Sequence, residues 1–145
     1  MRISEINEAT MKKHDIGFGL TQYEGTEYSL VGGSRSGSSM GGFTRLRYDI
    51  VDHKLHDETD NLNKSKVGFV ELFVKDGGNI EGLVNIVLPA GGRKQGLGSS
   101  IVKDIADTAG GTLKIYDIQH KAKGFWQKMG AELVRGKPYD AIISI

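Results

Sequence analysis

Alternating apolar and polar residues predict strands through the middle of the chain. The first of these strands places its apolar side chains on one face, and the second carries apolar residues on both faces. A strong turn signal, Asp-Gly-Gly-Asn at 76–79, joins the second strand to the third. We therefore expect an antiparallel meander. The three segments are 43–54, 66–75 and 80–89, with Leu46, Tyr48 and Ile50 on the shared face of the first and a polar connection at 56–66.

Apolar residues recur at helical spacing after the meander and predict two helices. The first follows a glycine-rich loop and ends at the glycine pair 110–111. A strand at 112–118 separates it from a second helix at 120–129, and this succession indicates a right-handed crossover with parallel pairing. Two terminal strands, 131–135 and 139–145, complete the pattern. The inward residues are Ile101, Val102, Ile105, Ala106 and Ala109 in the first helix, and Ala122, Phe125, Trp126 and Met129 in the second.

The N-terminal part carries weaker patterns. Apolar residues at helical spacing, with Ser4 as a candidate N-cap, predict a short helix over 4–13. Residues 17–31 are typical of a hairpin that turns at Glu24-Gly25. Residues 32–42 (GGSRSGSSMGG) have the composition of a flexible loop.

Composition and charge narrow the function classes. The chain has 145 residues, enough for one domain with a substantial core. Its formal net charge is +1, so no global basic field favours nucleic acid as a partner. It has no cysteine, which excludes a disulfide framework, a thiolate nucleophile and a cysteine-based zinc site.

The sequence gives little indication of a membrane-spanning segment, a secretory signal or a metal site. No stretch approaches the roughly 20 apolar residues of a membrane span, and the N-terminus has acidic residues without the long apolar run of a secretory signal. We therefore expect a cytoplasmic protein with no membrane partner. His53 and His56 are spaced i, i+3 in a polar stretch without a third ligand, so we expect no metal site.

Residues 89–111 (PAGGRKQGLGSSIVKDIADTAGG) place a glycine-rich basic loop between an apolar strand and a helix. Gly91 and Gly96 have the spacing of a Walker A loop, but Leu97 stands where that loop has lysine. A dinucleotide-binding pattern also begins here, but Ile101 stands where its last glycine belongs. Neither of these two phosphate-binding patterns explains the loop.

The start of the helix after this loop suits an anion. A helix N-terminus presents unpaired N–H groups and a partial positive charge, where a pyrophosphate can bind. Gly96 and Gly98 lack the Cβ atoms that would block close approach, and Arg93 and Lys94 can add charge-assisted hydrogen bonds. The alternative is that the glycines only form a tight turn and the basic pair is solvated.

Two motifs, one in the glycine-rich loop and one in the last predicted helix, resemble those of the GNAT superfamily of acetyl-CoA-dependent N-acetyltransferases. The family's cofactor-loop motif, Arg/Gln-x-x-Gly-x-Gly/Ala, is matched by 93–98 (RKQGLG), and the signature of its last helix by 119–131 (QHKAKGFWQKMGA). The resemblance covers 43–145 and implies that this part is the cofactor-binding core of a single GNAT-like domain, 1–145. Residues 1–42 would be a variable N-terminal part, without the two helices that usually cover the acceptor site.

This resemblance implies a fold of the broad α/β class, and more specifically an α+β fold with a mixed sheet. In it, an antiparallel meander leads into a βαβ crossover whose central strands splay apart. The implied activity is direct transfer of an acetyl group from acetyl-CoA to an amine in a ternary complex. The reduced N-terminal part leaves the acceptor groove open, which suits a protein or peptide amine. The implied cofactor-binding residues are Val87, Leu88, Arg93, Lys94, Gln95, Gly96, Leu97, Gly98, Ser99, Gln119 and Trp126.

Catalytic roles follow from the same resemblance. The implied oxyanion donor is the backbone N–H of Val87 or Leu88. A carboxylate or a water chain would accept the proton of the amine. Trp126, whose indole has no acidic proton, stands where many family members have the tyrosine that acts as general acid. The candidates are Glu81 for the base, with Glu71 as the alternative, and Tyr116, Tyr139 or solvent for the acid.

A second interpretation stays open beside the enzyme. Trp126, together with Gln119 in place of the family's asparagine, also fits a non-catalytic acyl-CoA-binding or protein-interaction module with the same fold. A homodimer is a further hypothesis, because the apolar last strand, 141–145 (AIISI), could pair across a sheet edge.

Overall fold

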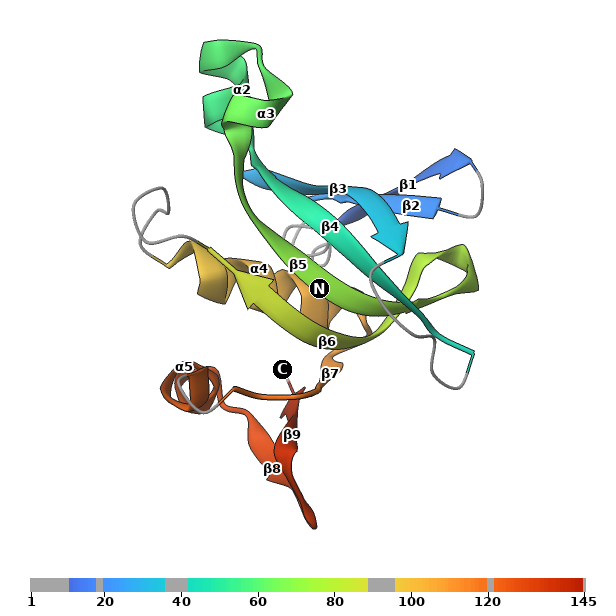
Figure 1. Cartoon of the computed structure of the whole chain (residues 1–145), viewed down its shortest axis with the longest axis vertical. Helices are drawn as coiled ribbons and strands as arrows, with labels where there is room; N and C mark the ends of the chain where they lie inside the picture. The colour runs from blue at the N-terminus through green and yellow to red at the C-terminus, as the bar shows by residue number, and fades with distance from the viewer. Residues whose placement is uncertain (1–10, 18–19, 36–41, 89–95, 120–121, 145) are drawn as a thin grey trace, which may run out of the picture.

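A nine-stranded mixed sheet organises the protein into an α+β fold (Figure 1). The computed structural model describes residues 11–17, 20–35, 42–88, 96–119 and 122–144. The strands follow the order β1-β2-β3-β4-β5-β6-β7-β9-β8 across the sheet. They are β1 (Lys12–Gly17), β2 (Leu20–Glu24), β3 (Tyr28–Arg35), β4 (Thr44–Asp52), β5 (Lys66–Lys75), β6 (Asn79–Val87), β7 (Thr112–Ile115), β8 (Glu132–Val134) and β9 (Lys137–Ser144).

The first six strands form one antiparallel meander, in which each strand pairs with the next along the chain. The three predicted central strands are therefore confirmed, and so is the hairpin that turns after Glu24. The expected shared face of β4 is also confirmed, because Leu46, Tyr48 and Ile50 are all buried. Alternation of apolar side chains thus fixes which face of the meander packs into the core.

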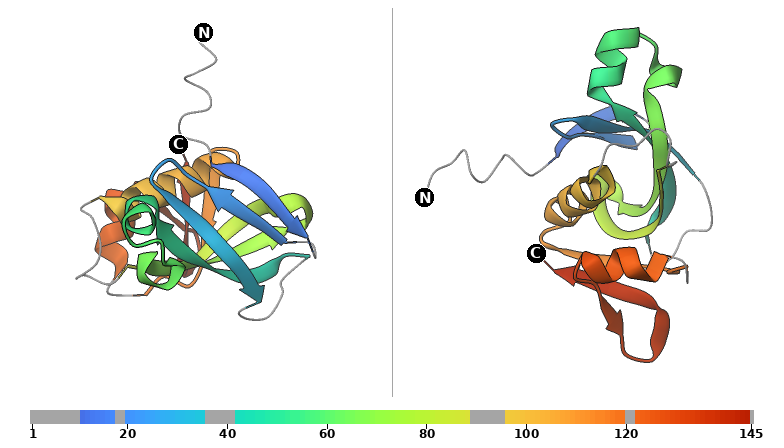
Figure 2. Two further views of the ribbon diagram at one scale, coloured as in Figure 1. Left: turned by 90° about the horizontal axis from the view of Figure 1, so that it is seen from above. Right: turned by 90° about the vertical axis from the view of Figure 1, so that its left-hand side faces the viewer.

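A helix crosses back over the sheet after the meander. Helix α4 (Leu97–Thr108) joins β6 to β7, and these two strands are parallel, as the sequence predicts. Figure 2 shows α4 lying against one face of the sheet. Its 12 residues are far fewer than the roughly 20 of a membrane span, and no other helix in the described part is long and apolar enough to cross a bilayer. The buried residues of α4 are Leu97, Ile101, Val102, Ile105 and Ala106.

The last strands extend the sheet beyond β7. Strand β9 is antiparallel to β7 on one side and to β8 on the other. Ala141 pairs with both Ile115 and Leu133, and Ile142 is paired on both sides in the same way. The expectation that this apolar strand offers a free edge to a second copy is therefore wrong for these two residues. A homodimer stays a prediction, but pairing through Ala141 and Ile142 no longer supports it.

The polar connection between β4 and β5 is helical rather than irregular. It contains α2 (His53–Thr59) and α3 (Leu62–Ser65). Asp52 caps α2, since its side chain accepts from the Leu55 N–H over 3.1 Å. Leu55 packs against the core, and Asp60 ends the helix in the left-handed conformation. A cap and one contact with the core thus stabilise a helix that has no buried residue of its own.

The N-terminal expectations hold only in part. Lys12 and Lys13 belong to strand β1, so the end of the predicted helix over 4–13 is wrong, while residues 1–10 lie outside the described part. Strand β3 continues to Arg35, which shortens the expected loop, and 36–41 are not described. The second predicted helix is α5 (Lys123–Lys128), shorter than expected.

One polar contact ties α4 to the meander. The buried Tyr28 hydroxyl donates to Asp104 Oδ2 over 2.7 Å. Burial raises the pKa of Asp104, the Tyr28 hydrogen bond opposes this shift, and Asp107 adds to it. Because the raised pKa means that the folded state binds this proton more tightly than the unfolded chain, protonation of Asp104 favours folding. The carboxylate therefore costs stability above its folded pKa, and this cost disappears as pH falls towards the usual value of about 3.9.

We expect Asp104→Asn to be more stable than the wild type at pH 7 and to lose this advantage by about pH 4. The amide oxygen of asparagine can still accept from Tyr28, so the comparison isolates the charge. Urea denaturation at both pH values measures it, with Asp57→Asn on the exposed surface of α2 as the control. An advantage of Asp104→Asn that is equal at the two pH values would contradict the assignment.

Candidate functional site

Strands β6 and β7 pair over a short distance and then part. Their partners are Gly82 with Lys114 and Leu83 with Ile115, and the Tyr116 N–H donates to the Leu83 carbonyl over 2.9 Å. Strand β6 continues beyond this fork to Val87 without β7 beside it. A cleft of about 600 Å³ lies at the fork, within the size range of small-molecule sites. The lining residues are Val84, Asn85, Ile86, Leu88, Gly96, Gly98, Ser99, Asp117, Gln119, Ala122, Phe125, Trp126 and Lys128.

A β-bulge in β6 shapes the first wall of the cleft. Leu83 pairs with Leu72 and Asn85 pairs with Glu71, which leaves Val84 as an extra residue on β6. A bulge bends its strand and interrupts the alternation of side chains. As a result, three consecutive residues, Val84, Asn85 and Ile86, all line the cleft, although neighbours on a regular strand would point to opposite faces.

The beginning of α4 forms the second wall. Gly96 takes the N-cap position in the left-handed conformation, with φ 80°, and no side chain caps the helix. The first turn holds no acidic residue, and the Ser100 N–H donates to the Gly96 carbonyl over 3.0 Å. Gly96, Gly98 and Ser99 all line the cleft. The cleft therefore borders a helix N-terminus whose first N–H groups carry partial positive charge.

Gly98 allows this helix start to lie close to the end of β6. A Cβ atom there would sit 3.3 Å from Leu88 Cδ1 and 3.6 Å from Phe125 Cε1. A side chain just after β6 and one of α5 thus approach the backbone of α4. A larger residue at this position would push the walls of the cleft apart.

Helix α5 supplies the third wall. Trp126 is only 6% exposed, and its ring meets Phe125 edge to face at 4.9 Å between centroids. The rim near this helix is polar, with Asp117, Gln119 and Lys128 among the lining residues. The cleft is therefore lined by both apolar and polar side chains, as a site for a ligand with apolar and polar parts requires.

The structure brings six of the predicted cofactor residues together around the cleft. Leu97 is not one of them, since its side chain is buried in the core, and Val87 is 36% exposed and does not line the cleft either. Arg93, Lys94 and Gln95 lie outside the described residues. The six that line the cleft are Leu88, Gly96, Gly98, Ser99, Gln119 and Trp126.

The two predicted catalytic side chains lie near the fork but do not line the cleft. Glu81 forms an ion pair with Lys75 Nζ at 2.9 Å. The ring of Tyr116 lies against Gly82 and meets Phe73 edge to face at 5.2 Å. Burial, then the charges of Asp140 and Glu81, raise the pKa of Tyr116 above its usual value of about 10, so this phenol stays protonated at neutral pH.

The alternative base lies closer to the cleft. Glu71 is the cross-strand partner of Asn85, which lines the cleft, and residues in such a pair project from the same face. Glu71 is 9% exposed, and Arg45 Nε lies 3.2 Å from its Oε2 atom. The side chain of Tyr139, the alternative acid, lies outside the described part of the structure.

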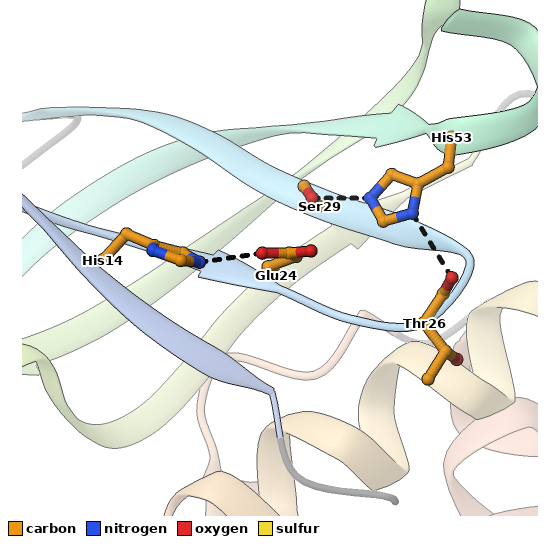
Figure 3. Close-up of polar contacts among 5 residues, drawn as sticks. All are labelled: His14, Glu24, Thr26, Ser29 and His53. Atoms are coloured by element: carbon orange, nitrogen blue, oxygen red, sulfur yellow. Dashed lines mark hydrogen bonds and ion pairs between the residues drawn. The ribbon is translucent and has the colours of Figure 1, made fainter. Parts of the chain in front are cut away.

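Two histidines of the N-terminal half, His14 and His53, make ordinary polar contacts (Figure 3). His53 Nδ1 lies 3.3 Å from the Thr26 carbonyl oxygen, and its Nε2 lies 2.7 Å from the Ser29 hydroxyl oxygen. His14 Nε2 contacts Glu24 Oε1 at 2.8 Å, and this hydrogen bond lowers the pKa of Glu24. In the described part of the chain, no three His, Cys, Asp or Glu residues gather as metal ligands would.

Sequence reasoning missed the bulged wall and, of the aromatic wall, identified Trp126 but assigned Phe125 only to the core. Val84, Asn85 and Ile86 looked like part of a regular strand, and Phe125 like an inward residue of a helix. The break after Leu83 has no local sequence signal, because a bulge is defined by the register of the neighbouring strand. Comparison with protein-family models and with curated protein sequences finds no match to this chain.

Proposed function

We propose that the cleft binds acetyl-CoA and that the protein is an N-acetyltransferase of the GNAT type. The observation that supports this most directly is the uncapped N-terminus of α4, which borders a cleft between two diverging parallel strands. The order of elements also resembles the GNAT superfamily: an antiparallel meander, a helix, a parallel strand, a short helix and a terminal hairpin. This family assignment remains part of the proposal.

The residues around the cleft suit the chemistry of acetyl-CoA. The first N–H groups of α4 suit the pyrophosphate, since they offer donors and positive charge without a competing side chain. The apolar side chains of Val84, Ile86 and Leu88 suit the uncharged arm that leads to the thioester. Asn85 offers an amide that can both donate and accept hydrogen bonds.

The reaction we propose is direct transfer. The amine nitrogen forms a bond to the thioester carbon, the carbon–sulfur bond breaks, and the sulfur leaves as a thiolate. Either Glu71 or Glu81 accepts the amine proton, directly or through water. Tyr116 is a poor proton donor to the thiolate, because its pKa lies above 10 and a thiol has a pKa of about 8.5. Solvent therefore protonates the thiolate in this scheme.

A second candidate function is a module that binds an acyl-CoA without transferring the acyl group. It is favoured by one observation: neither Glu81 nor Tyr116 lines the cleft. The two candidates make the same prediction for binding and opposite predictions for release of free CoA thiol in the presence of an amine. Measurement of both quantities on the same preparation separates them.

Ser99→Glu tests the proposed phosphate site without threatening the fold. A carboxylate in the first turn stabilises a helix, but here it would stand inside the cleft and repel the pyrophosphate. We expect the wild type to bind acetyl-CoA with a micromolar Kd and Ser99→Glu to bind at least about tenfold more weakly, a loss of 1.4 kcal/mol or more. Isothermal titration calorimetry measures this. Quenching of Trp126, the only tryptophan of the chain, gives an independent readout.

Ser100→Glu is the matched control. Ser100 lies in the same helical turn but is exposed and does not line the cleft. The control adds the same charge, so it should retain most of the affinity. Equal losses in the two variants would indicate a general charge effect rather than a site at Ser99. No binding of acetyl-CoA by the wild type would overturn both candidate functions.

A further inference from the structure

One face of the sheet, opposite α4, carries a row of polar and aromatic residues across β4, β5 and β6. We call it the outer face. Cross-strand pairing places Arg47 beside Glu71 and Glu71 beside Asn85, so the three form one row. No helix of the described part lies over this face, whereas α4 covers the other (Figure 2). The residues that define the outer face are Arg45, Arg47, Phe69, Glu71, Phe73 and Asn85.

Most charges on and around this face are already paired. Arg45 contacts Glu71 at 3.2 Å. Two further pairs join neighbouring elements, Lys66 with Asp49 at 3.2 Å and Lys75 with Glu81 at 2.9 Å. Within each pair the two charges neutralise each other, so none of these side chains favours the binding of a charged ligand.

Arg47 differs from these cations. Its side chain is exposed, and its guanidinium lies 3.6 Å above the centroid of the Phe69 ring. Within the described residues it has neither an ion pair nor a hydrogen bond. Stacking on an aromatic ring holds the guanidinium plane and leaves the N–H donors along its edge available, in a geometry that matches a carboxylate.

The row also fixes how far Arg47 lies from the cleft. Adjacent strands are about 4.8 Å apart, so Arg47 lies about 10 Å from Asn85, two strands away. Asn85 lines the cleft in which we place the thioester. An extended peptide advances about 3.3 Å per residue and covers this distance in about three residues.

From this geometry we propose that the acceptor is a peptide with an acidic side chain about three residues from the amine that is acetylated, and that Arg47 binds this carboxylate. The inference rests on the proposed acetyl transfer for the position of the amine. The remaining observations concern only the outer face. Charge complementarity selects the partner, since Arg45 forms an ion pair with Glu71, whereas Arg47, the other cation of the outer face, forms no ion pair within the described residues.

Two synthetic peptides test the proposal. Ala-Ala-Ala-Glu-Ala and Ala-Ala-Ala-Gln-Ala, both amidated at the C-terminus, differ by a single carboxylate. We expect the wild type to acetylate the glutamate peptide with a kcat/KM at least about fivefold higher, measured as release of CoA thiol, because one exposed, charge-assisted hydrogen bond contributes of the order of 1 kcal/mol. Fluorescence anisotropy of labelled peptides measures the same preference as binding, independently of catalysis.

Arg47→Glu should abolish or reverse this preference and leave the affinity for acetyl-CoA unchanged in calorimetry. Arg135→Glu is the matched control, because Arg135 is exposed in the turn between β8 and β9, away from the outer face. Arg47→Gln removes the charge with less perturbation and should abolish the preference as well.

The outcomes separate this inference from the proposed function. Selective binding of the glutamate peptide that Arg47→Glu removes supports a carboxylate-binding site at Arg47. If acetyl-CoA then does not bind, this site stands, and acetylation of the bound peptide is overturned. Equal binding of the two peptides by the wild type overturns it, even if acetyl-CoA binds and is turned over. A preference that persists in Arg47→Glu overturns it too.

Discussion

Gly68→Ala is expected to destabilise the protein by about 3 kcal/mol and to weaken binding in the cleft. A Cβ atom at this position of β5 would collide with the Val87 carbonyl oxygen and would lie 3.1 Å from Leu88 Cδ2. The first of these contacts is with backbone, which cannot turn away as a flexible side chain can. Because Leu88 lines the cleft, the end of β6 must move, and the wall of the cleft must move with it.

Gly124→Ala is the control for this substitution. Gly124 is exposed in α5, and a Cβ atom there meets nothing within 4 Å. Alanine favours a helix over glycine by up to about 1 kcal/mol, so this variant should be slightly more stable than the wild type. Urea denaturation measures the stabilities, and calorimetry with acetyl-CoA measures binding. A Gly68→Ala variant with wild-type stability and affinity would show that β6 does not need this close approach.

The sequence predicts the meander and α4 well because both bury one face along their whole length. Apolar residues recur at strand spacing along β4 and at helical spacing along α4. The prediction of each element therefore rests on several residues rather than on a single one. The segment 56–66 gives no such repeat. Its helix α2 depends on the cap at Asp52 and on the contact of Leu55 with the core, which a local pattern does not reveal.

The candidate site is less predictable than the fold. Gly96 and Gly98 were identified because a helix start beside a ligand needs residues without a side chain. The sequence does not indicate which face of the sheet each side chain of β6 occupies, because this strand contains two irregularities. One lies at Val84, and the other lies where Phe73 pairs with Gly82 and Val74 with Ile80. Each shifts the alternation by one residue. Counting along the sequence therefore cannot decide whether Glu81 or Glu71 faces the reacting atoms.

Trp126→Ala is expected to lower the free energy of unfolding by about 3–5 kcal/mol, as loss of a buried aromatic side chain commonly does. Helix α5 has six residues, too few to be stable without packing. Trp126 is the buried residue of this helix. Without it, α5 should lose its docked position, and the affinity for acetyl-CoA should fall at least about tenfold. Far-UV circular dichroism follows unfolding, because this variant has no tryptophan left.

Trp126→Phe separates packing from any special role of the indole. Phenylalanine keeps an aromatic ring beside Phe125 and removes the indole N–H, so we expect a loss of about 1–1.5 kcal/mol in stability and an affinity close to that of the wild type. If Trp126→Phe binds as weakly as Trp126→Ala, the indole itself contacts the ligand. If both variants bind as the wild type does, α5 is not a wall of the binding site. Gly68 and Trp126 act on opposite sides of the cleft, so only a ligand held between β6 and α5 is sensitive to both.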